Sequence, residues 1–269
     1  MSRLDIAGLG AWGTSFSSWE TFANGINTGT WQTETLLQPT LIPTRERRRA
    51  PQSVKLAVEV MNQACEMAGL DPAGIAAVVS SSMGDMQITD YLCRTLATNP
   101  AAVSPTRFHN SVHNATTGYW SIAARSHAAT NAVSAYDYTA SMAFLEAAIQ
   151  SLEDESPVLV VTQEMAAPKA LHNTCPSDQA FSAAILLTPA GMNSDPLATV
   201  EFDISRTSSD WPELPGDLRH GLESNFGARL VPLLAVIAAN NRARKTCPVN
   251  LEFPLTPASS LKLSVTTHT

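Results

Sequence analysis

The chain has 269 residues, of which 44% are hydrophobic, and a formal net charge of -7. This size allows one sizeable core, in a single domain or in two tightly fused halves. The acidic balance argues against nucleic acid or an anionic membrane as a partner, because both are bound by clustered positive charge. The sequence shows no signal-peptide pattern, no apolar run long enough to span a membrane, and no CxxC spacing among its four cysteines. We therefore expect a soluble cytoplasmic protein with reduced thiols.

Strands and helices alternate from the first residues onward. Residues 4–8 are compatible with a strand, and aromatic residues at helical spacing predict a helix over 17–24. The clearest helix covers residues 54–68, where a broad apolar stripe ends at Gly69 in the C-terminal cap position. The continuously apolar residues 75–79 then predict a strand that is buried on both faces.

The same alternation continues through the middle of the chain and becomes sparser toward the end. Predicted strands cover residues 132–136, 157–162, 181–187, 199–204 and 261–265, and predicted helices cover residues 141–152 and 225–239. Such alternation predicts a layered α/β fold.

A literal G-x-G-x-x-G, formed by Gly8, Gly10 and Gly13, follows the first strand. A dinucleotide fold needs this turn to open a helix at once, and then a second strand that ends in an acidic residue about 20 positions on. The region after Asn24 is aperiodic, and Glu34 lies in no recognisable strand. We interpret the motif as a tight glycine turn.

Two histidine groups have the spacing of functional sites. His109 and His113 lie four residues apart, but no acidic residue stands between them and no third ligand is evident, so we expect structural histidines and no metal. His172 and Cys175, three residues apart, meet the same objection. Sequence spacing leaves a Cys/His nucleophilic pair open there.

Ser141 lies where a predicted strand passes into a helix, which is where a nucleophile can stand. The hydrolase elbow G-x-S-x-G requires glycines two residues before and two after the serine, and Thr139 and Ala143 occupy these places. Capping of the helix by Thr139 or Ser141, with Asp137 at the positive end of the helix, explains the residues better.

Positive charge is concentrated in Arg45, Arg47, Arg48 and Arg49. A contact with a carrier protein or a phosphate is one interpretation. A solvated helix start, with local pairing to Glu46, is the other.

Several segments, in their order and spacing, resemble the β-ketoacyl synthases. Residues 6–10 resemble the synthase opening, the helix that ends Ala-Gly-Leu-Asp-Pro before a buried strand resembles the next part, and residues 104–118 are similar to a segment at the synthase dimer interface. The likeness covers residues 3–190. Residues 46–49 and 104–115 further resemble a short ketoacyl-synthase-like group encoded beside aryl polyene pathways in Gram-negative bacteria.

The resemblance implies a thiolase-like α/β fold. Residues 1–190 would form a complete first half, and residues 191–269 a truncated remnant packed on it as one compact unit. In such pathways a chain length factor pairs with a catalytic synthase, so a heterodimer is implied as well.

The resemblance also locates the residues that catalysis would need. Synthases carry a cysteine nucleophile at a strand-to-helix turn, and Tyr138 stands at that place, flanked by Asp137, Thr139 and Ser141. A tyrosyl hydroxyl, with a pKa of about 10, accepts acyl groups poorly. No His-Gly-Thr motif occurs, and His220 is too isolated to replace one. We therefore expect a protein that is not an enzyme by itself and uses no cofactor.

Together these features predict a chain length factor-like subunit that binds a full-length synthase through residues 104–120 and 132–148 and shapes its acyl tunnel in aryl polyene or polyketide-type biosynthesis. An acyl carrier protein is expected to reach the complex, with the four arginines as its contact. The predicted interface and tunnel residues are Ser104, Phe108, His109, His113, Asn114, Trp120, Tyr138 and Phe144. Two alternatives stay open: an acyl-thioester hydrolase or transferase that uses Ser141 or Cys175, and a homodimeric module that binds an acyl carrier protein.

Overall fold

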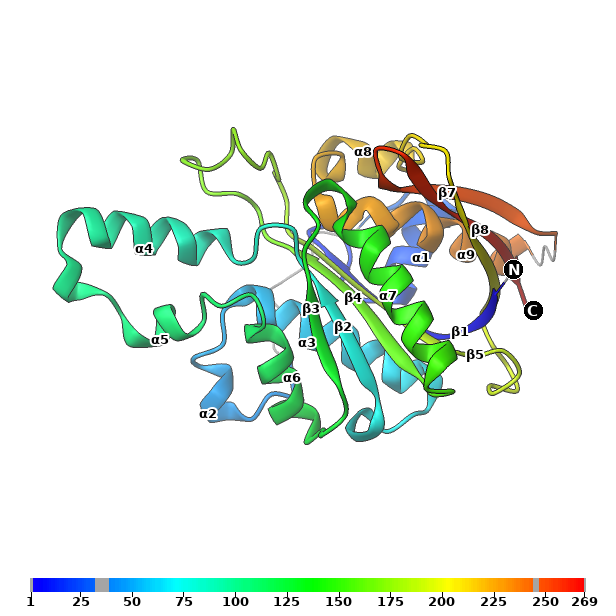
Figure 1. Ribbon diagram of the computed structural model, residues 1–269, viewed down its shortest axis with the longest axis horizontal. Helices are drawn as coiled ribbons and strands as arrows, with labels where there is room; N and C mark the ends of the chain where they lie inside the picture. The colour runs from blue at the N-terminus through cyan, green and yellow to red at the C-terminus, as the bar shows by residue number, and fades with distance from the viewer. Residues whose placement is uncertain (1, 32–38, 244–246, 269) are drawn as a thin grey trace.

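The computed structural model describes residues 2–31, 39–243 and 247–268 (Figure 1). Its described strands form one mixed sheet in the order β3-β2-β4-β5-β1-β6-β8-β7. The strands are β1 (Ser2–Gly13), β2 (Ala76–Ser80), β3 (Thr130–Val133), β4 (Val158–Glu164), β5 (Phe181–Pro189), β6 (Ala198–Ser205), β7 (Val249–Thr256) and β8 (Ser259–Thr267). Strand β2 runs parallel to β3 and β4, and the other pairs are antiparallel.

Helices cover both faces of this sheet (Figure 1). They are α1 (Trp19–Thr28), α2 (Thr44–Arg47), α3 (Gln52–Ala68), α4 (Met86–Thr98), α5 (Pro105–His109), α6 (Ala115–Ala124), α7 (Thr139–Glu153), α8 (Gly216–Leu222) and α9 (Val231–Ala243). Helices α3 and α6 enclose one apolar core with the sheet, and α1, α7 and α9 enclose the other. The result is the layered α/β arrangement that the alternating pattern predicts.

Most predicted elements of the first half are present. Helix α3 buries nine residues and ends at Gly69, whose φ of 66° is the left-handed conformation that its cap position requires. Strand β2 is buried along nearly its whole length, as its apolar run predicts. The strand predicted over residues 132–136 is shorter, because β3 ends at Val133 and a 3-10 turn, η3 (Tyr136–Tyr138), follows.

The prediction of a tight glycine turn is wrong for Gly8 and Gly10, which lie inside β1. Gly13 ends β1 and begins a tight turn closed by backbone hydrogen bonds with Phe16, and none of the three glycines has a positive φ. Gly8 and Gly10 instead lie against α3. A Cβ atom on Gly10 would overlap the Val60 carbonyl, and one on Gly8 would overlap the Ala64 carbonyl. These glycines therefore let the backbone of α3 approach the backbone of β1 directly.

The C-terminal part continues the same sheet. Strand β6 pairs with the first residues of β1, and β8 and β7 follow it outward. Residues 198–243 and 247–267 thus share a sheet and a core with the preceding part of the chain. The division into a complete first half and a truncated remnant stays a prediction.

Candidate functional site

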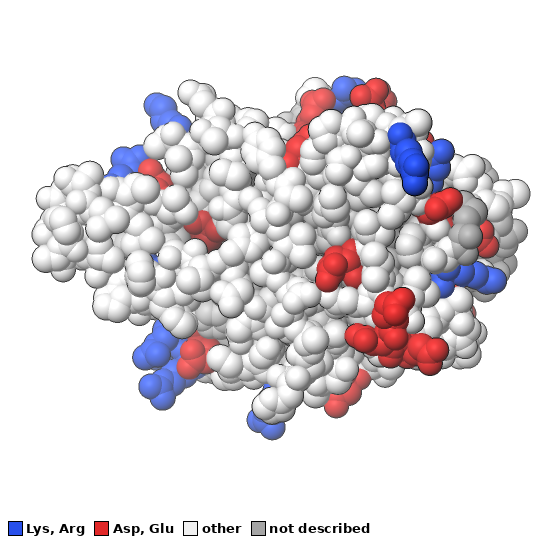
Figure 2. All heavy atoms as spheres, in the orientation of Figure 1, with Lys and Arg blue, Asp and Glu red and all other residues white. Residues whose placement is uncertain are grey.

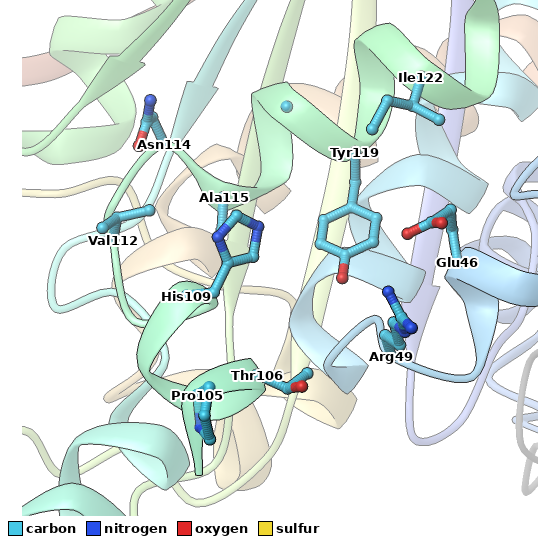
Figure 3. Close-up of a pocket in the computed structure, with 11 residues that line it drawn as sticks. Glu46, Arg49, Pro105, Thr106, His109, Val112, Asn114, Ala115, Tyr119 and Ile122 are labelled. Atoms are coloured by element: carbon cyan, nitrogen blue, oxygen red, sulfur yellow. The ribbon is translucent and has the colours of Figure 1, made fainter. Parts of the chain in front are cut away.

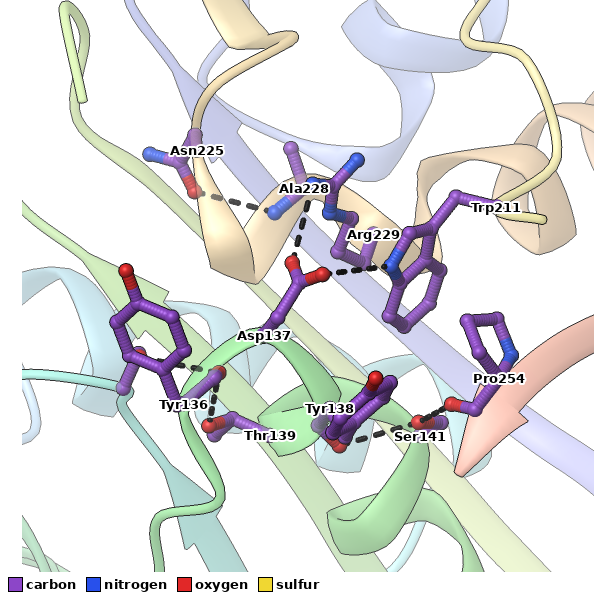
Figure 4. Close-up of polar contacts among 11 residues, drawn as sticks. Tyr136, Asp137, Tyr138, Thr139, Ser141, Trp211, Asn225, Ala228, Arg229 and Pro254 are labelled. Carbon is purple, nitrogen blue, oxygen red and sulfur yellow. Dashed lines mark hydrogen bonds and ion pairs between the residues drawn. The ribbon is translucent and has the colours of Figure 1, made fainter. Parts of the chain in front are cut away.

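The turn that joins β3 to α7 begins earlier than the sequence predicts, because β3 ends at Val133 and η3 follows (Figure 4). Tyr136 has a φ of 51°, in the left-handed region that costs a residue with a side chain about 1–3 kcal/mol. The Tyr136 side chain is 56% exposed, and its ring centroid lies 5.1 Å from that of Phe226. Tyr138 is half-buried and lies directly before α7. The turn therefore presents two tyrosines, with the constrained backbone at Tyr136.

Asp137 connects this turn to the C-terminal part of the chain (Figure 4). Its carboxylate accepts hydrogen bonds from Arg229 Nη2 at 3.1 Å and from Trp211 Nε1 at 3.4 Å. The Arg229 guanidinium lies 5.0 Å from the Trp211 ring centroid, within the range of a cation–π contact. Asp137 thus holds the turn against η4 (Phe226–Leu230).

The predicted capping of α7 by Thr139 or Ser141 is wrong. Ser141 is fully buried, and its hydroxyl faces the carbonyl oxygens of Pro254, at 2.5 Å, and Tyr138, at 3.0 Å. The Thr139 hydroxyl donates to the Tyr136 carbonyl at 2.7 Å. Both hydroxyls turn toward carbonyls because α7 continues directly from η3. A buried serine hydroxyl that donates to carbonyl oxygens is not poised as a nucleophile.

Cys175 is equally unsuited to covalent catalysis. Burial, followed by the nearby charge of Glu164, raises the pKa of its thiol to about 11. His172 Nε2 donates to the Asp178 carboxylate at 2.7 Å, and no hydrogen bond joins the histidine to Cys175. The thiolate is the nucleophilic form of cysteine, so a thiol that stays protonated does not support the hydrolase alternative. Ser141, whose hydroxyl donates to carbonyl oxygens, does not support it either.

A buried glutamate beneath the turn was not singled out from the sequence. Glu164 ends β4, and its carboxylate accepts hydrogen bonds from the backbone N–H of Ser82 and from Ser81 Oγ at 3.3 Å. Ser82 Oγ in turn donates to the Tyr136 carbonyl at 3.0 Å. Burial raises the pKa of Glu164 to about 8, although both hydrogen bonds oppose this shift. An acidic residue at the carboxyl end of an apolar strand is the sequence signal that marks it.

Glu164 should make stability fall as the pH rises. Between the unfolded pKa of 4.5 and the folded pKa of about 8, the folded chain keeps a proton that the unfolded chain releases. The free energy of unfolding should therefore decrease by up to about 1.4 kcal/mol per pH unit in this window. Urea unfolding of Glu164→Gln should lack this slope and show a more stable protein than the parent above about pH 8.

A matched control is Glu153→Gln, which removes an exposed carboxylate from the end of α7. Its stability should follow the parent at every pH. Parallel stability curves for the parent and Glu164→Gln would show that Glu164 is ionised in the folded chain.

The predicted interface segment lies on and beside a projecting arm, formed by α4, η2 (Pro100–Ala102) and α5 (Figure 1). Ser104 caps α5 by accepting from Arg107 N at 3.4 Å, and Phe108 is 65% exposed. His109 and Asn114 are exposed, and His113 Nε2 lies 2.8 Å from the Ser81 carbonyl oxygen. The structure thus brings these five residues to one side of the molecule.

Two residues of the predicted interface cannot make the contact expected of them. Trp120 is 0% exposed in the core under α3 and α6, and Phe144 is 1% exposed in the core under α7. Each fills the chain's own interior, because the exposed face of its helix is formed by other side chains. Tyr136 is the exposed aromatic residue that stands at the turn instead.

Two grooves flank α5. The first, of about 570 Å³, lies between α5 and α6, where Tyr119 points toward Glu46 and Arg49 (Figure 3). The second, of about 680 Å³, lies between the arm and the start of α3. Arg45 and Arg47 belong to α2 near both grooves. In the space-filling view of Figure 2, positive charge gathers beneath the arm, whereas the arm's outer end is uncharged.

Within the described ranges, no three His, Cys, Asp or Glu side chains are grouped to hold a metal ion. Nor do these ranges contain a helix with the length and apolar character needed to cross a membrane.

A family model described as "Beta-ketoacyl synthase, N-terminal domain" matches residues 19–215. The chain belongs to this family of β-ketoacyl synthases. No match was found among curated proteins. The predicted thiolase-like α/β fold is confirmed by similar solved structures that cover essentially the whole chain.

Three of these structures are complexes. A ketosynthase (ApeO) in complex with its chain length factor (ApeC) from Xenorhabdus doucetiae has a TM-score of 0.69 and 20% identity, over 98% of this chain and 100% of the other. The ishigamide ketosynthase/chain length factor has a TM-score of 0.73 and 13% identity, over 100% of both chains. The AntDE:AntF complex, a type II polyketide ketosynthase with its acyl carrier protein, has a TM-score of 0.77 and 13% identity, over 99% of both chains.

Proposed function

We propose that this β-ketoacyl synthase homologue is a non-catalytic, chain length factor-like subunit that pairs with a full-length synthase. The pair would work in the cytoplasm, in aryl polyene or polyketide-type biosynthesis. Two of the similar structures are ketosynthases with chain length factors, which favours this assignment. The observation that most supports the proposal is that the arm buries few of its own residues and exposes apolar side chains.

The arm has too little support from its own chain. Helix α4 has 13 residues and buries only Met86 and Ile88, both in its first turn. Beyond that turn it packs mainly on η2 and α5. A helix of this length is marginal without tertiary packing. Leu96 at 56% and Phe108 at 65% exposure form apolar surface that a partner would cover.

Strand β3 adds a second open surface. It ends the sheet with one unpaired edge, and Asn131 and Ala132 on it are exposed. An exposed edge strand offers free N–H and C=O groups to a strand of another chain. The arm and β3 flank α6 (Figure 1). A partner that covers all three would bury a continuous face.

The lack of a suitable nucleophile at the turn between β3 and α7, and at Cys175, supports a non-catalytic role. The turn carries Tyr136 and Tyr138, Ser141 donates to carbonyl oxygens, and the high pKa of Cys175 keeps its thiol protonated. A covalent acyl step needs an activated nucleophile beside a base. Tyr136 and Tyr138 are placed to line the acyl tunnel of the partner synthase. Phe144 is buried in the core of its own chain and cannot line that tunnel.

Co-expression with the neighbouring full-length synthase tests the pairing. Size-exclusion chromatography with mass measurement should give a stable one-to-one complex, and the chain alone should be unstable or self-associated. A well-behaved monomer that elutes separately from the synthase would contradict the proposal.

Removing the turn tyrosines tests the tunnel role. Tyr138→Ala and Tyr136→Ala should each shift the product length of the complex while turnover stays within about threefold of the parent, because neither residue is a nucleophile. Mass spectrometry of the products measures the shift. Ile204→Ala, which truncates a half-exposed side chain on β6 away from the arm, should leave product length unchanged. An unchanged distribution in both turn variants would remove the tunnel role.

A further inference from the structure

Residues 81–84, which we call the arm junction, join the arm to the sheet. They follow the end of β2 and precede Asp85, the N-cap residue of α4. Ser81 and Ser82 are buried, and Gly84 has a φ of 67°, which glycine adopts without strain. The arm junction therefore fixes the direction in which α4 leaves the sheet.

Glu164, at the end of β4, holds the arm junction from inside the molecule. Its carboxylate accepts hydrogen bonds from the backbone N–H of Ser82 and from Ser81 Oγ. Ser81 Oγ in turn accepts from Gly84 N at 3.0 Å. One buried side chain thus holds three of the four junction residues, either directly or through Ser81.

The turn after β3 holds the arm junction from the other side. Ser82 Oγ donates to the Tyr136 carbonyl at 3.0 Å, and Ser134 Oγ donates to the Ser82 carbonyl at 2.8 Å. The arm itself adds little support, because α4 buries only Met86 and Ile88. The position of the arm therefore depends on the hydrogen bonds at its junction.

The elements packed around Glu164 bring no charge that balances a carboxylate. Within the described ranges Glu164 forms no ion pair. Strand β5 pairs Phe181 with it, and η4 places Gly227 against it, whereas Arg229, the charged residue of η4, pairs with the turn. Burial and the charge of Glu164 raise the pKa of Cys175 to about 11, so this thiol is neutral at physiological pH.

Other titratable groups near the arm junction lie closer to solvent. His113 Nε2 lies 2.8 Å from the Ser81 carbonyl oxygen, but His113 is exposed. On the segment between β4 and β5, His172 pairs with Asp178, and Lys169 is exposed. Glu164 is thus the buried ionisable group on which the junction's hydrogen bonds converge.

We propose that Glu164 is a pH-sensitive anchor of the arm. While the carboxyl group keeps its proton, it is neutral and can stay buried, and the arm junction stays closed. When the proton is released to solvent, a buried carboxylate remains without a cation, so an opening that admits water becomes more favourable. The arm is the part that opens, because it has the fewest buried contacts to lose. The inference concerns this chain alone and does not depend on pairing with a synthase.

Hydrogen exchange of the full chain at pH 7 and pH 9 tests the anchor. Burial raises the pKa of Glu164 from 4.5 to about 8, and opening restores the ordinary value, so opening should become about tenfold more favourable over this interval. Protection factors of residues 86–98 should be lower than those of α9, which shows that the arm opens by itself, and should fall about tenfold. In Glu164→Gln, whose amide is always neutral, they should not fall. No fall in the parent, or an equal fall in Glu164→Gln, would overturn the proposal.

Two matched variants keep the test independent of Glu164→Gln. Ser81→Ala removes the bond between Glu164 and Gly84, and should lower arm protection at least fivefold at both pH values, by roughly the loss of one hydrogen bond. Ser121→Ala removes a hydroxyl that donates to the Thr117 carbonyl within α6, and should leave arm protection within about twofold. Equal arm protection in these two variants would overturn the role of the arm junction.

His113→Gln separates the anchor from the exposed histidine. Because a histidine titrates mainly below pH 7, this variant should keep the tenfold fall between pH 7 and pH 9. Loss of the fall in His113→Gln, with the fall retained in Glu164→Gln, would assign the pH dependence to His113 and overturn the proposal.

Discussion

Gly10→Ala is expected to lower the free energy of unfolding by more than about 3 kcal/mol, or to prevent folding. The new methyl group would overlap the Val60 carbonyl in the backbone of α3. A backbone carbonyl cannot swing aside as a flexible side chain can, so the whole of α3 would have to move from β1. That movement would open the core beneath a helix that buries nine residues. Urea unfolding followed by circular dichroism measures the loss.

Gly118→Ala is the matched control. Gly118 lies inside α6, has no positive φ, and has no atom within 4 Å of where a Cβ would stand. This substitution should stabilise the chain by about 0.5–1 kcal/mol, because alanine is the better helix residue. Opposite signs at the two glycines would identify close backbone approach as the cause. A Gly10→Ala protein as stable as the parent would show that the backbone of α3 does not approach β1 closely at Gly10.

The double substitution Leu96→Ala and Phe108→Ala is expected to weaken binding to the full-length synthase by about 100-fold. Both side chains stand exposed on the arm, so their truncation should remove interface contacts without opening the core. Alanine also favours the helix at position 96 in α4, which protects the arm's own structure. The dissociation constant of the purified pair measures the effect.

Ile204→Ala serves as the control for this result. Ile204 is 50% exposed, but it lies on β6, away from the arm. It should leave the affinity within about twofold, and all variants should retain the parent's unfolding midpoint. If the arm variant bound as tightly as the parent, the arm would not be the contact surface, even if the complex forms.

Helix α3 and strands β2 and β4 could be predicted from the sequence because their signals are local. A stripe with helical spacing that ends in a cap glycine, and apolar runs that suit buried strands, depend on residues close together in the chain. The replacement of a synthase cysteine by Tyr138 is implied by the resemblance and stays a prediction. The backbone constraint at Tyr136 could not be predicted, because it arises where β3 stops and η3 begins.

The sequence by itself determined the α/β class and the main elements of the first part of the chain. Only the tertiary structure decided that Gly8 and Gly10 lie against α3, that Phe144 fills the chain's own core, and that Glu164 is buried beneath Tyr136. The physical reason is the same in each case. Periodicity reports which face of an element is apolar, whereas burial, close approach and shifted pKa values depend on which distant segment packs against that face.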